Sequence, residues 1–258
     1  MKAVILAGGL GTRLSEETLI KPKPMVEIGG MPIIWHIMKG YASYGVNEFV
    51  ILGGYKSHII KEFFRDYMMR LSSVRFNMRD RTMDIIDSQG EDWVVTVLDT
   101  GENSNTGGRL RRAKSVVGSE PFFFTYGDGV SNVDFNALLQ AHEESSASVT
   151  LTAVQPPGRF GALSLPDGEK MVTSFQEKPQ GDGAWINGGF FVVNPEAIDA
   201  ISGDEIAWEQ QPLATLAKAG KLSAYRHNGF WQSMDTLRDK EYLEKLWSKS
   251  DAPWKSWD

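Results

Sequence analysis

The 258 residues carry a formal charge of −6, with 41% hydrophobic and 23% charged side chains and no cysteine. The acidic balance argues against broad binding to nucleic acid or to an anionic membrane surface. The lack of cysteine excludes disulfides and thiolate metal sites, and four scattered histidines form no zinc pattern. Because no apolar run resembles a signal peptide or a membrane helix, we expect a soluble cytoplasmic protein without nucleic-acid or membrane partners.

Strands and helices alternate through the first half of the chain. Apolar runs predict strands at residues 3–7, 49–52, 93–98 and 122–126. Helical periodicity predicts helices at residues 32–44, 57–67 and 107–117, and another that Asp134 would cap. This alternation predicts a mainly parallel sheet with helices on both faces, a Rossmann-like three-layer α/β/α fold. Ligands of such sheets bind outside the carboxyl ends of the strands.

An insertion at about 74–92 interrupts the alternation. Val74–Met78 and Met83–Ile86 flank Arg-Asp-Arg-Thr and predict a small β-rich insertion, a hairpin. It is either a surface decoration or an oligomerisation arm, and we favour the arm.

The second half is richer in strands and ends in a helical appendage. Strands are predicted at 149–154, 162–165, 172–176 and 190–193, and helices at 208–219 and 236–247. Trp254 and Trp257 of the tail are expected to pack on a surface of this chain or on a partner subunit.

A glycine turn follows the first strand. Residues 6–13 read Leu-Ala-Gly-Gly-Leu-Gly-Thr-Arg, and Pro22-Lys23-Pro24 follows shortly afterwards. Glycines let backbone N–H groups approach an anion, and Arg13 and Lys23 add positive charge. The turn lacks the third glycine of the dinucleotide fingerprint and the Gly-Lys-Ser/Thr of the Walker A loop. It therefore predicts a polyphosphate site of another kind, an ordinary strand-to-helix turn being the alternative.

Two aspartates are candidate ligands for a metal of the magnesium type. Asp128 lies between two glycines after the strand at 122–126, where a turn aspartate is the structural alternative. Asp235 precedes the predicted helix at Thr236, where the alternative is an N-cap.

Two further motifs follow strands in the second half. Glu177-Lys178-Pro179 is suited to a second phosphate, and Asn187-Gly188-Gly189 to sugar hydroxyls. The structural alternatives are an exposed turn and a β-bulge.

In this order and at these separations, the motifs resemble those of the sugar-1-phosphate nucleotidyltransferases, a family with a GT-A-like fold. The resemblance covers nearly the whole chain. The sequences at 106–110, 156–161 and 175–179 are most similar to the members that act on CTP and glucose 1-phosphate. Thymidylyltransferases instead tend to carry Lys-Gln-Leu where this chain has Pro22-Lys23-Pro24.

The resemblance implies a reaction and a domain organisation. With Mg²⁺, a phosphate oxygen of glucose 1-phosphate would attack the α-phosphorus of CTP, giving CDP-glucose and pyrophosphate. A single domain, 1–258, would comprise a nucleotide-binding half at 1–148, a sugar-phosphate half at 149–235, and a C-terminal helix and tail at 236–258. The family also implies a homo-oligomer, such as a hexamer, and a place in dideoxysugar and O-antigen lipopolysaccharide synthesis.

Three alternatives to this assignment remain open on the sequence. One is a relative that pairs UTP with glucose 1-phosphate or GTP with mannose 1-phosphate. Another is a non-catalytic nucleotide-sugar-binding regulatory subunit, against which the presence of Arg13, Lys23, Asp128 and Asp235 argues. A GT-A glycosyltransferase usually shows Asp-x-Asp, whereas Gly129 and Val130 follow Asp128 here.

Residue roles follow from the same resemblance. Arg13 and Lys23 would be catalytic, stabilising charge on the leaving pyrophosphate and on the α-phosphate. Asp128 and Asp235 would bind the metal. The sugar phosphate would contact Glu177, Lys178, Asn187 and Gly188. The nucleotide would contact Leu6, Ala7, Gly8, Gly9, Leu10, Gly11, Thr12, Arg13, Lys23, Ser104, Thr106, Gly107, Arg109 and Asp128.

Overall fold

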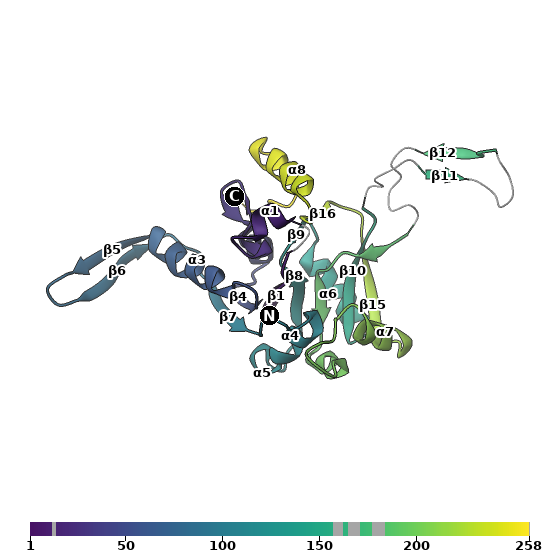
Figure 1. The fold of residues 1–258 in the computed structure, drawn as a ribbon. Helices are drawn as coiled ribbons and strands as arrows, with labels where there is room; N and C mark the ends of the chain where they lie inside the picture. The colour runs from purple at the N-terminus through teal and green to yellow at the C-terminus, as the bar shows by residue number, and fades with distance from the viewer. Residues whose placement is uncertain (12–13, 157–161, 165–170, 177–183, 258) are drawn as a thin grey trace.

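The computed structural model describes residues 1–11, 14–156, 162–164, 171–176 and 184–257. Four predicted site residues lie outside the described residues: Thr12, Arg13, Glu177 and Lys178. The central sheet has the strand order β13-β10-β14-β8-β1-β4-β7, and β15 pairs with β10 (Figure 1). Its strands are β1 (Lys2–Ala7), β4 (Glu48–Gly53), β7 (Val94–Asp99), β8 (Phe122–Tyr126), β10 (Val149–Val154), β13 (Ile186–Asn187), β14 (Phe191–Val193) and β15 (Leu222–His227).

The sheet is mixed and mainly parallel, as predicted. β1 pairs in parallel with β4 and β8, β4 with β7, and β10 with β15, whereas β14 runs antiparallel to β8 and β10. In this register Leu6 lies opposite Leu52 on one side and Tyr126 on the other. The carboxyl ends of β1, β4 and β8 therefore meet at one edge of the sheet, where a ligand site is expected.

Helices cover both faces of the sheet and complete three layers. They are α1 (Ser15–Thr18), α2 (Ile33–Ala42), α3 (Ser57–Arg70), α4 (Thr106–Arg112), α5 (Lys114–Val117), α6 (Phe135–Glu144), α7 (Gln211–Lys218) and α8 (Leu237–Ser248). Ala3 and Ile5 of β1 belong to the buried cluster that contains side chains of α2, α6 and α8. Val4 and Leu6 belong to the opposite cluster, with side chains of α4, α5 and α7. Alternate residues of β1 thus enter two cores, as in a parallel strand buried on both faces.

Three elements differ from the sequence-based expectation. The helix predicted at 107–117 is interrupted at Ala113, whose N–H is shared between three carbonyls of the preceding turn. The helix predicted from Trp208 begins at Gln211, because the Trp208 indole is fully buried in the core and the main-chain N–H of Trp208 donates to the Thr106 hydroxyl. β15 was not predicted.

Short strands and two 3₁₀ helices of the described residues lie outside the central sheet. They are β2 (Glu27–Ile28), β3 (Met31–Pro32), β9 (Gly129–Ser131), β11 (Ala162–Ser164), β12 (Ser174–Gln176), β16 (Trp231–Ser233), η2 (Lys23–Met25) and η4 (Pro195–Ala200). β16 pairs with β9, so the loop before α8 is held beside the loop after β8. The tail folds back on its own chain: Trp254 is buried in the core, and Trp257 contacts Trp35 edge to face.

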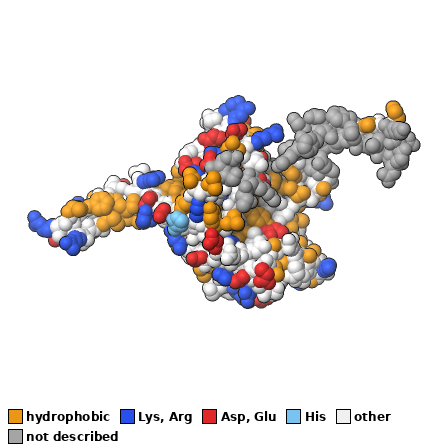
Figure 2. Space-filling model, in the orientation of Figure 1, with side chains coloured by type: hydrophobic (Ala, Val, Ile, Leu, Met, Phe, Trp, Pro, Cys, Tyr) orange, Lys and Arg blue, Asp and Glu red, His pale blue; other side chains and the backbone are white. Residues whose placement is uncertain are grey.

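The predicted hairpin is confirmed and projects from the body. β5 (Ser72–Asn77) and β6 (Thr82–Ser88) form an antiparallel ribbon beyond α3 (Figure 1). Figure 2 shows hydrophobic side chains along this arm and basic ones at its tip. Its exposed large hydrophobic residues are Phe76, Met78, Met83, Ile85 and Ile86.

Throughout the described ranges, no helix has the length and apolar character needed to cross a membrane.

Candidate active site

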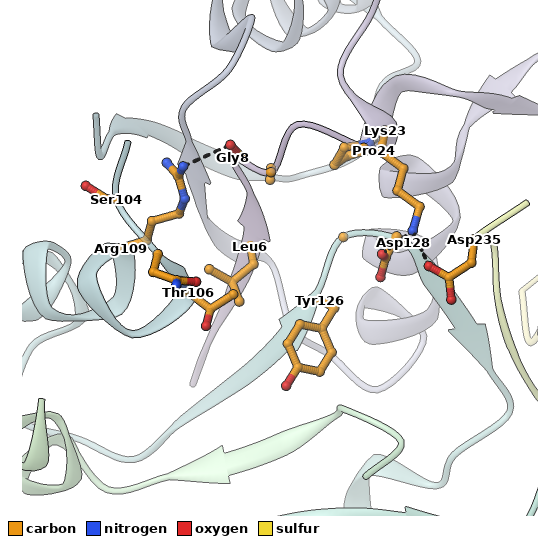
Figure 3. Close-up of a pocket in the computed structure, with 15 residues that line it drawn as sticks. Leu6, Gly8, Lys23, Pro24, Ser104, Thr106, Arg109, Tyr126, Asp128 and Asp235 are labelled. Atoms are coloured by element: carbon orange, nitrogen blue, oxygen red, sulfur yellow. Dashed lines mark hydrogen bonds and ion pairs between the residues drawn. The ribbon is translucent and has the colours of Figure 1, made fainter. Parts of the chain in front are cut away.

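A cavity of about 380 Å³ lies at the carboxyl ends of β1 and β8. Its walls come from the glycine turn after β1, the start of α4, and the loops that carry Lys23, Asp128 and Asp235 (Figure 3). The lining residues are Leu6, Ala7, Gly8, Gly9, Gly11, Lys23, Pro24, Ser104, Asn105, Thr106, Arg109, Tyr126, Gly127, Asp128 and Asp235. Segments more than 200 residues apart thus meet at the edge where the sheet topology places a ligand.

Most of the described residues predicted to bind nucleotide line this cavity, but two do not. Leu10 is 55% exposed outside the lining, and Gly107 is buried against the main chain of Ile206 and Trp208. Pro24, Asn105, Tyr126 and Gly127 also line the cavity, although none of them was individually predicted as a binding residue. Tyr126 and Gly127 end the predicted strand at 122–126, so the strand-end rule was a signal for them.

The predicted sugar contacts Asn187 and Gly188 lie next to the cavity rather than in its lining. Asn187 donates from Nδ2 to the phenol oxygen of Tyr126 at 3.2 Å, and Tyr126 lines the cavity. The Gly188 carbonyl accepts a 2.7 Å hydrogen bond from Trp231 Nε1. Burial raises the pKa of Tyr126 well above its usual value, with the nearby Glu209 carboxylate adding to the shift. The phenol is therefore a neutral group between the cavity and Asn187.

Arg109 fixes the position of the glycine turn through a hydrogen bond to its main chain. Its side chain is buried, and its two Nη groups donate to the carbonyls of Gly8 (2.9 Å), Gly101 (2.7 Å) and Glu102 (3.0 Å). Nη1 also lies 2.8 Å from the Thr100 hydroxyl. Burial lowers the pKa of Arg109, and Arg112 adds to this effect. Because a buried guanidinium needs such acceptors, the side chain ties the turn to the ends of β4 and β7.

Two positions of the turn require glycine, one because of a close contact and the other because of its backbone conformation. A Cβ atom on Gly8 would lie 2.2 Å from Nη1 of Arg109, well inside van der Waals contact. Gly11 has a positive φ of 65°, a conformation that L residues with a side chain rarely adopt. The Thr18 hydroxyl donates to the Gly11 carbonyl at 2.9 Å and fixes the end of the turn.

The two hydroxyls predicted to contact nucleotide also have partners within the protein. Ser104 donates to the Thr100 carbonyl at 2.6 Å. Thr106 donates to Glu209 Oε2 at 2.7 Å and accepts from the Trp208 N–H at 2.9 Å. Both residues line the cavity, so their hydrogen bonds fix the shape of its wall.

Lys23 lies between the two predicted metal ligands. Its Nζ is 2.6 Å from Asp128 Oδ2 and 2.8 Å from Asp235 Oδ1 (Figure 3). Burial alone would lower the pKa of Lys23, but the two carboxylates together outweigh burial and raise it. Lys23 is therefore a firmly charged ammonium group at the wall of the cavity.

Local structure separates Asp235 from the capping of α8. Thr236 is the N-cap residue: its hydroxyl accepts from the Asp239 N–H, and the Asp239 side chain accepts from the Thr236 N–H. This capping box satisfies the helix start without the Asp235 side chain. The Ser233 hydroxyl donates to Asp235 Oδ2 at 3.0 Å, so the carboxylate is oriented toward the cavity.

The Asp128–Asp235 pair fits a magnesium ion. Two carboxylate oxygens from different segments converge on one cation, the Lys23 ammonium, at 2.6 and 2.8 Å. Carboxylate oxygens are the donors that Mg²⁺ prefers, and Mg²⁺ usually takes one or two of them with water and substrate phosphates. Within the described residues, no group of three or more acidic or histidine side chains could hold a metal ion. The remaining ligands of such an ion would therefore be phosphate and water.

Comparisons with known proteins identify the family of the chain. The family model described as nucleotidyl transferase matches residues 2–231. The chain is 58% identical to the glucose-1-phosphate cytidylyltransferase of Salmonella typhi, with 100% of both chains covered. It is 44% identical to the probable glucose-1-phosphate cytidylyltransferase of Bacillus subtilis, again with 100% of both covered.

Solved structures share the fold. HddC from Yersinia pseudotuberculosis matches with a TM-score of 0.70 at 23% identity, covering 95% of this chain and 99% of that one. UDP-glucose pyrophosphorylase from Acinetobacter baumanii matches with a TM-score of 0.71 at 17% identity, covering 96% and 93%. The family match and the full-length identity lead to one conclusion: the chain belongs to the nucleotidyl transferase family.

Proposed function

We propose that this protein is a glucose-1-phosphate cytidylyltransferase, which converts CTP and α-D-glucose 1-phosphate into CDP-glucose and pyrophosphate. The observation that carries the proposal is the 58% identity to enzymes of that name over the whole of both chains. The cavity supports it, because a glycine turn, an ammonium group and two carboxylates suit a nucleoside triphosphate and a metal.

The reaction is a displacement at phosphorus. A phosphate oxygen of glucose 1-phosphate attacks the α-phosphorus of CTP, a new O–P bond forms, and the bond from the α-phosphorus to the β-phosphate oxygen breaks. The electron pair of that bond leaves with pyrophosphate. Since the attacking phosphate is already ionised near neutral pH, no general base is needed. The work of the protein is positioning and charge stabilisation.

We assign the nucleotide phosphates to the glycine turn and Lys23. Backbone N–H groups at residues 8–11 would face the phosphates, and Arg109 would keep the turn in shape. The Lys23 ammonium would donate to the α-phosphate and stabilise its growing charge. Arg13 would do the same for the departing pyrophosphate.

Members of this family generally use a divalent metal, and we propose Mg²⁺ here. Asp128 and Asp235 would hold it. When bound, the ion would neutralise phosphate charge and orient the two substrates.

The sugar phosphate is assigned to the side of the cavity near Tyr126. Asn187 adjoins that side through its 3.2 Å hydrogen bond to Tyr126, and with Gly188 it would contact glucose. Glu177 would also contact glucose, and Lys178 would neutralise the attacking phosphate. We further propose 1–148 and 149–235 as the nucleotide and sugar-phosphate halves of one domain, followed by 236–258.

A homo-oligomer and a cytoplasmic location are part of the proposal. The arm formed by β5 and β6 exposes apolar side chains along both strands, and a second copy of this chain would cover them. The turn at its tip, residues 78–81, bears Arg79 and Arg81 with Asp80 between them, and its net positive charge complements an acidic protein with net charge −6. A cytoplasmic location follows from the proposed substrates, because nucleoside triphosphates are intracellular molecules.

Detection of the product tests the proposal. The protein is incubated with CTP, glucose 1-phosphate and Mg²⁺, and phosphorus NMR and mass spectrometry follow the products. We expect CDP-glucose and pyrophosphate in equal amounts, and neither when glucose 1-phosphate is left out. Binding of the nucleotide without any turnover would instead support the regulatory-subunit alternative and contradict the proposal.

A further inference from the structure

Lys23 occupies the position between the two carboxylates that a metal ion would take. Its Nζ lies within 2.8 Å of one oxygen of each aspartate, and the side chain is only 12% exposed. Mg²⁺–oxygen distances are about 2.0–2.1 Å, so each carboxylate would need to shift by less than about 1 Å to bind the ion. An ammonium group and a divalent cation cannot share this space.

The two cations also compete for the same charge. Asp128 and Asp235 each accept a charge-assisted hydrogen bond from the Lys23 ammonium. A metal ion arriving alone would have to break both bonds and leave the buried ammonium without a partner, which is costly.

A nucleotide removes this obstacle. Its phosphates supply the oxygen ligands that two carboxylates cannot provide, and they give the Lys23 ammonium a new anionic partner. Pro22 and Pro24 flank Lys23 and fix its main chain, so a change of partner would be made by the flexible side chain alone.

We propose that Lys23 is a built-in competitor of the metal, which bars the free divalent ion from the Asp128–Asp235 pair and moves to the α-phosphate when nucleotide and metal enter together. This inference deepens the proposed function and rests on it for the identity of the nucleotide. It assigns Lys23 a second task besides charge stabilisation: to make metal binding conditional on nucleotide binding.

Metal binding without turnover tests the proposal. Mn²⁺ serves as the probe, and its affinity for the nucleotide-free protein is measured by calorimetry and by electron paramagnetic resonance of the free ion. We expect weak binding to the wild type and an affinity higher by roughly ten- to a hundredfold in Lys23→Met, because hydrogen bonds to charged groups no longer have to be broken. Lys23→Arg, which keeps the positive charge, should stay close to the wild type.

A matched control is Lys21→Met. Lys21 lies two residues away, and its ammonium pairs with Glu27 at 3.3 Å instead of with the metal pair, so its loss should leave Mn²⁺ affinity unchanged. Equal Mn²⁺ affinity in Lys23→Met and the wild type would overturn the proposal, as would tight binding of Mn²⁺ to the nucleotide-free wild type.

The wild-type measurement stands even where Lys23→Met does not fold. Failure of this inference is also separable from failure of the proposed function. Mn²⁺ affinity is measured without nucleotide, whereas the cytidylyltransferase assignment fails on the products formed and the nucleotide used.

Discussion

Nη2 of Arg109 lies 2.9 Å from the carbonyl oxygen of Gly8, although the two residues are 101 positions apart in the sequence. The guanidinium underlies the glycine turn, and its other hydrogen bonds reach the ends of β4 and β7. The geometry of the proposed phosphate-binding turn is therefore set from within the protein, by a basic side chain whose Nη hydrogens are directed to main-chain and hydroxyl oxygens.

Replacement of Arg109 by Met should damage both stability and nucleotide binding. The loss leaves buried carbonyls without donors, which costs about 1–3 kcal/mol for each such group. We expect a lower melting temperature and a higher KM for CTP. Arg111→Met is the control, since Arg111 is half exposed and pairs with Asp204 at 3.7 Å. Equal effects of the two substitutions would refute the positioning role of Arg109.

The contact between Arg109 and Gly8 predicts that substitutions at two neighbouring glycines differ in their effect on stability. Gly8→Ala places a methyl group 2.2 Å from Arg109 and should cost about 1–3 kcal/mol of unfolding free energy. A Cβ on Gly9 meets nothing within 4 Å, so Gly9→Ala should change stability by less than about 0.5 kcal/mol. Urea denaturation of the two variants measures the difference, and its absence would show that the turn tolerates a shift of the guanidinium.

Lys23→Ala should lower kcat far more than it changes KM for CTP. The ammonium is assigned to charge that grows at the α-phosphate in the transition state, and loss of one such donor costs about 10²–10³ in rate. Steady-state kinetics with Lys21→Ala as the control measure this. A variant that keeps the wild-type kcat would remove Lys23 from the catalytic assignment.

Acid should destabilise the protein through His36. Burial lowers the pKa of His36 from 6.5 to about 4, and the ring lies against Trp247 and Trp254. Below pH 6.5 His36 binds a proton in the unfolded chain but stays neutral in the folded chain. The unfolding free energy therefore falls as the pH falls toward 4. The stability that the neutral His36 ring contributes is present in full above pH 6.5, and about 3 kcal/mol of it is lost by pH 4.

The measurement is the unfolding free energy from urea titrations at about pH 7 and about pH 5. His36→Gln should reduce the slope against pH by up to one proton, because glutamine does not titrate. An unchanged slope in the variant would place the acid sensitivity elsewhere.

The arm formed by β5 and β6 should be required for self-association. The double substitution Phe76→Asp with Ile86→Asp puts charge on exposed apolar positions and should lower the mass measured by light scattering to that of a smaller species. Leu237→Asp, an exposed leucine on α8, serves as the control. A wild type that is monomeric at high concentration would contradict the oligomer proposal.

The sequence predicted the fold more fully than it predicted how the site is held together. Continuous apolar runs in β1 and β8 mark strands buried on both faces, and the strand-end rule then locates the site. β15 reads Leu-Ser-Ala-Tyr-Arg-His, a mixed pattern with too few apolar residues to indicate a strand by itself. In the structure β15 is a strand because it pairs in parallel with β10.

The sequence indicated candidate site residues but not the contacts between them. The Lys23–Asp235 pair spans 212 positions and depends on β16 pairing with β9, a contact that no local pattern encodes. Asp235 could equally have been an N-cap, and only the capping box of Thr236 and Asp239 resolves this. Arg109 is one of several basic residues in its segment, and its burial became visible only in three dimensions.

The central claim is that the cavity accepts CTP for transfer to glucose 1-phosphate. Its most direct test is kcat/KM for CTP, UTP, dTTP and GTP, each with saturating glucose 1-phosphate and Mg²⁺, followed by pyrophosphate release. We predict that CTP exceeds each of the others by about 10² or more. Equal or higher kcat/KM with UTP, dTTP or GTP would contradict the cytidylyltransferase assignment.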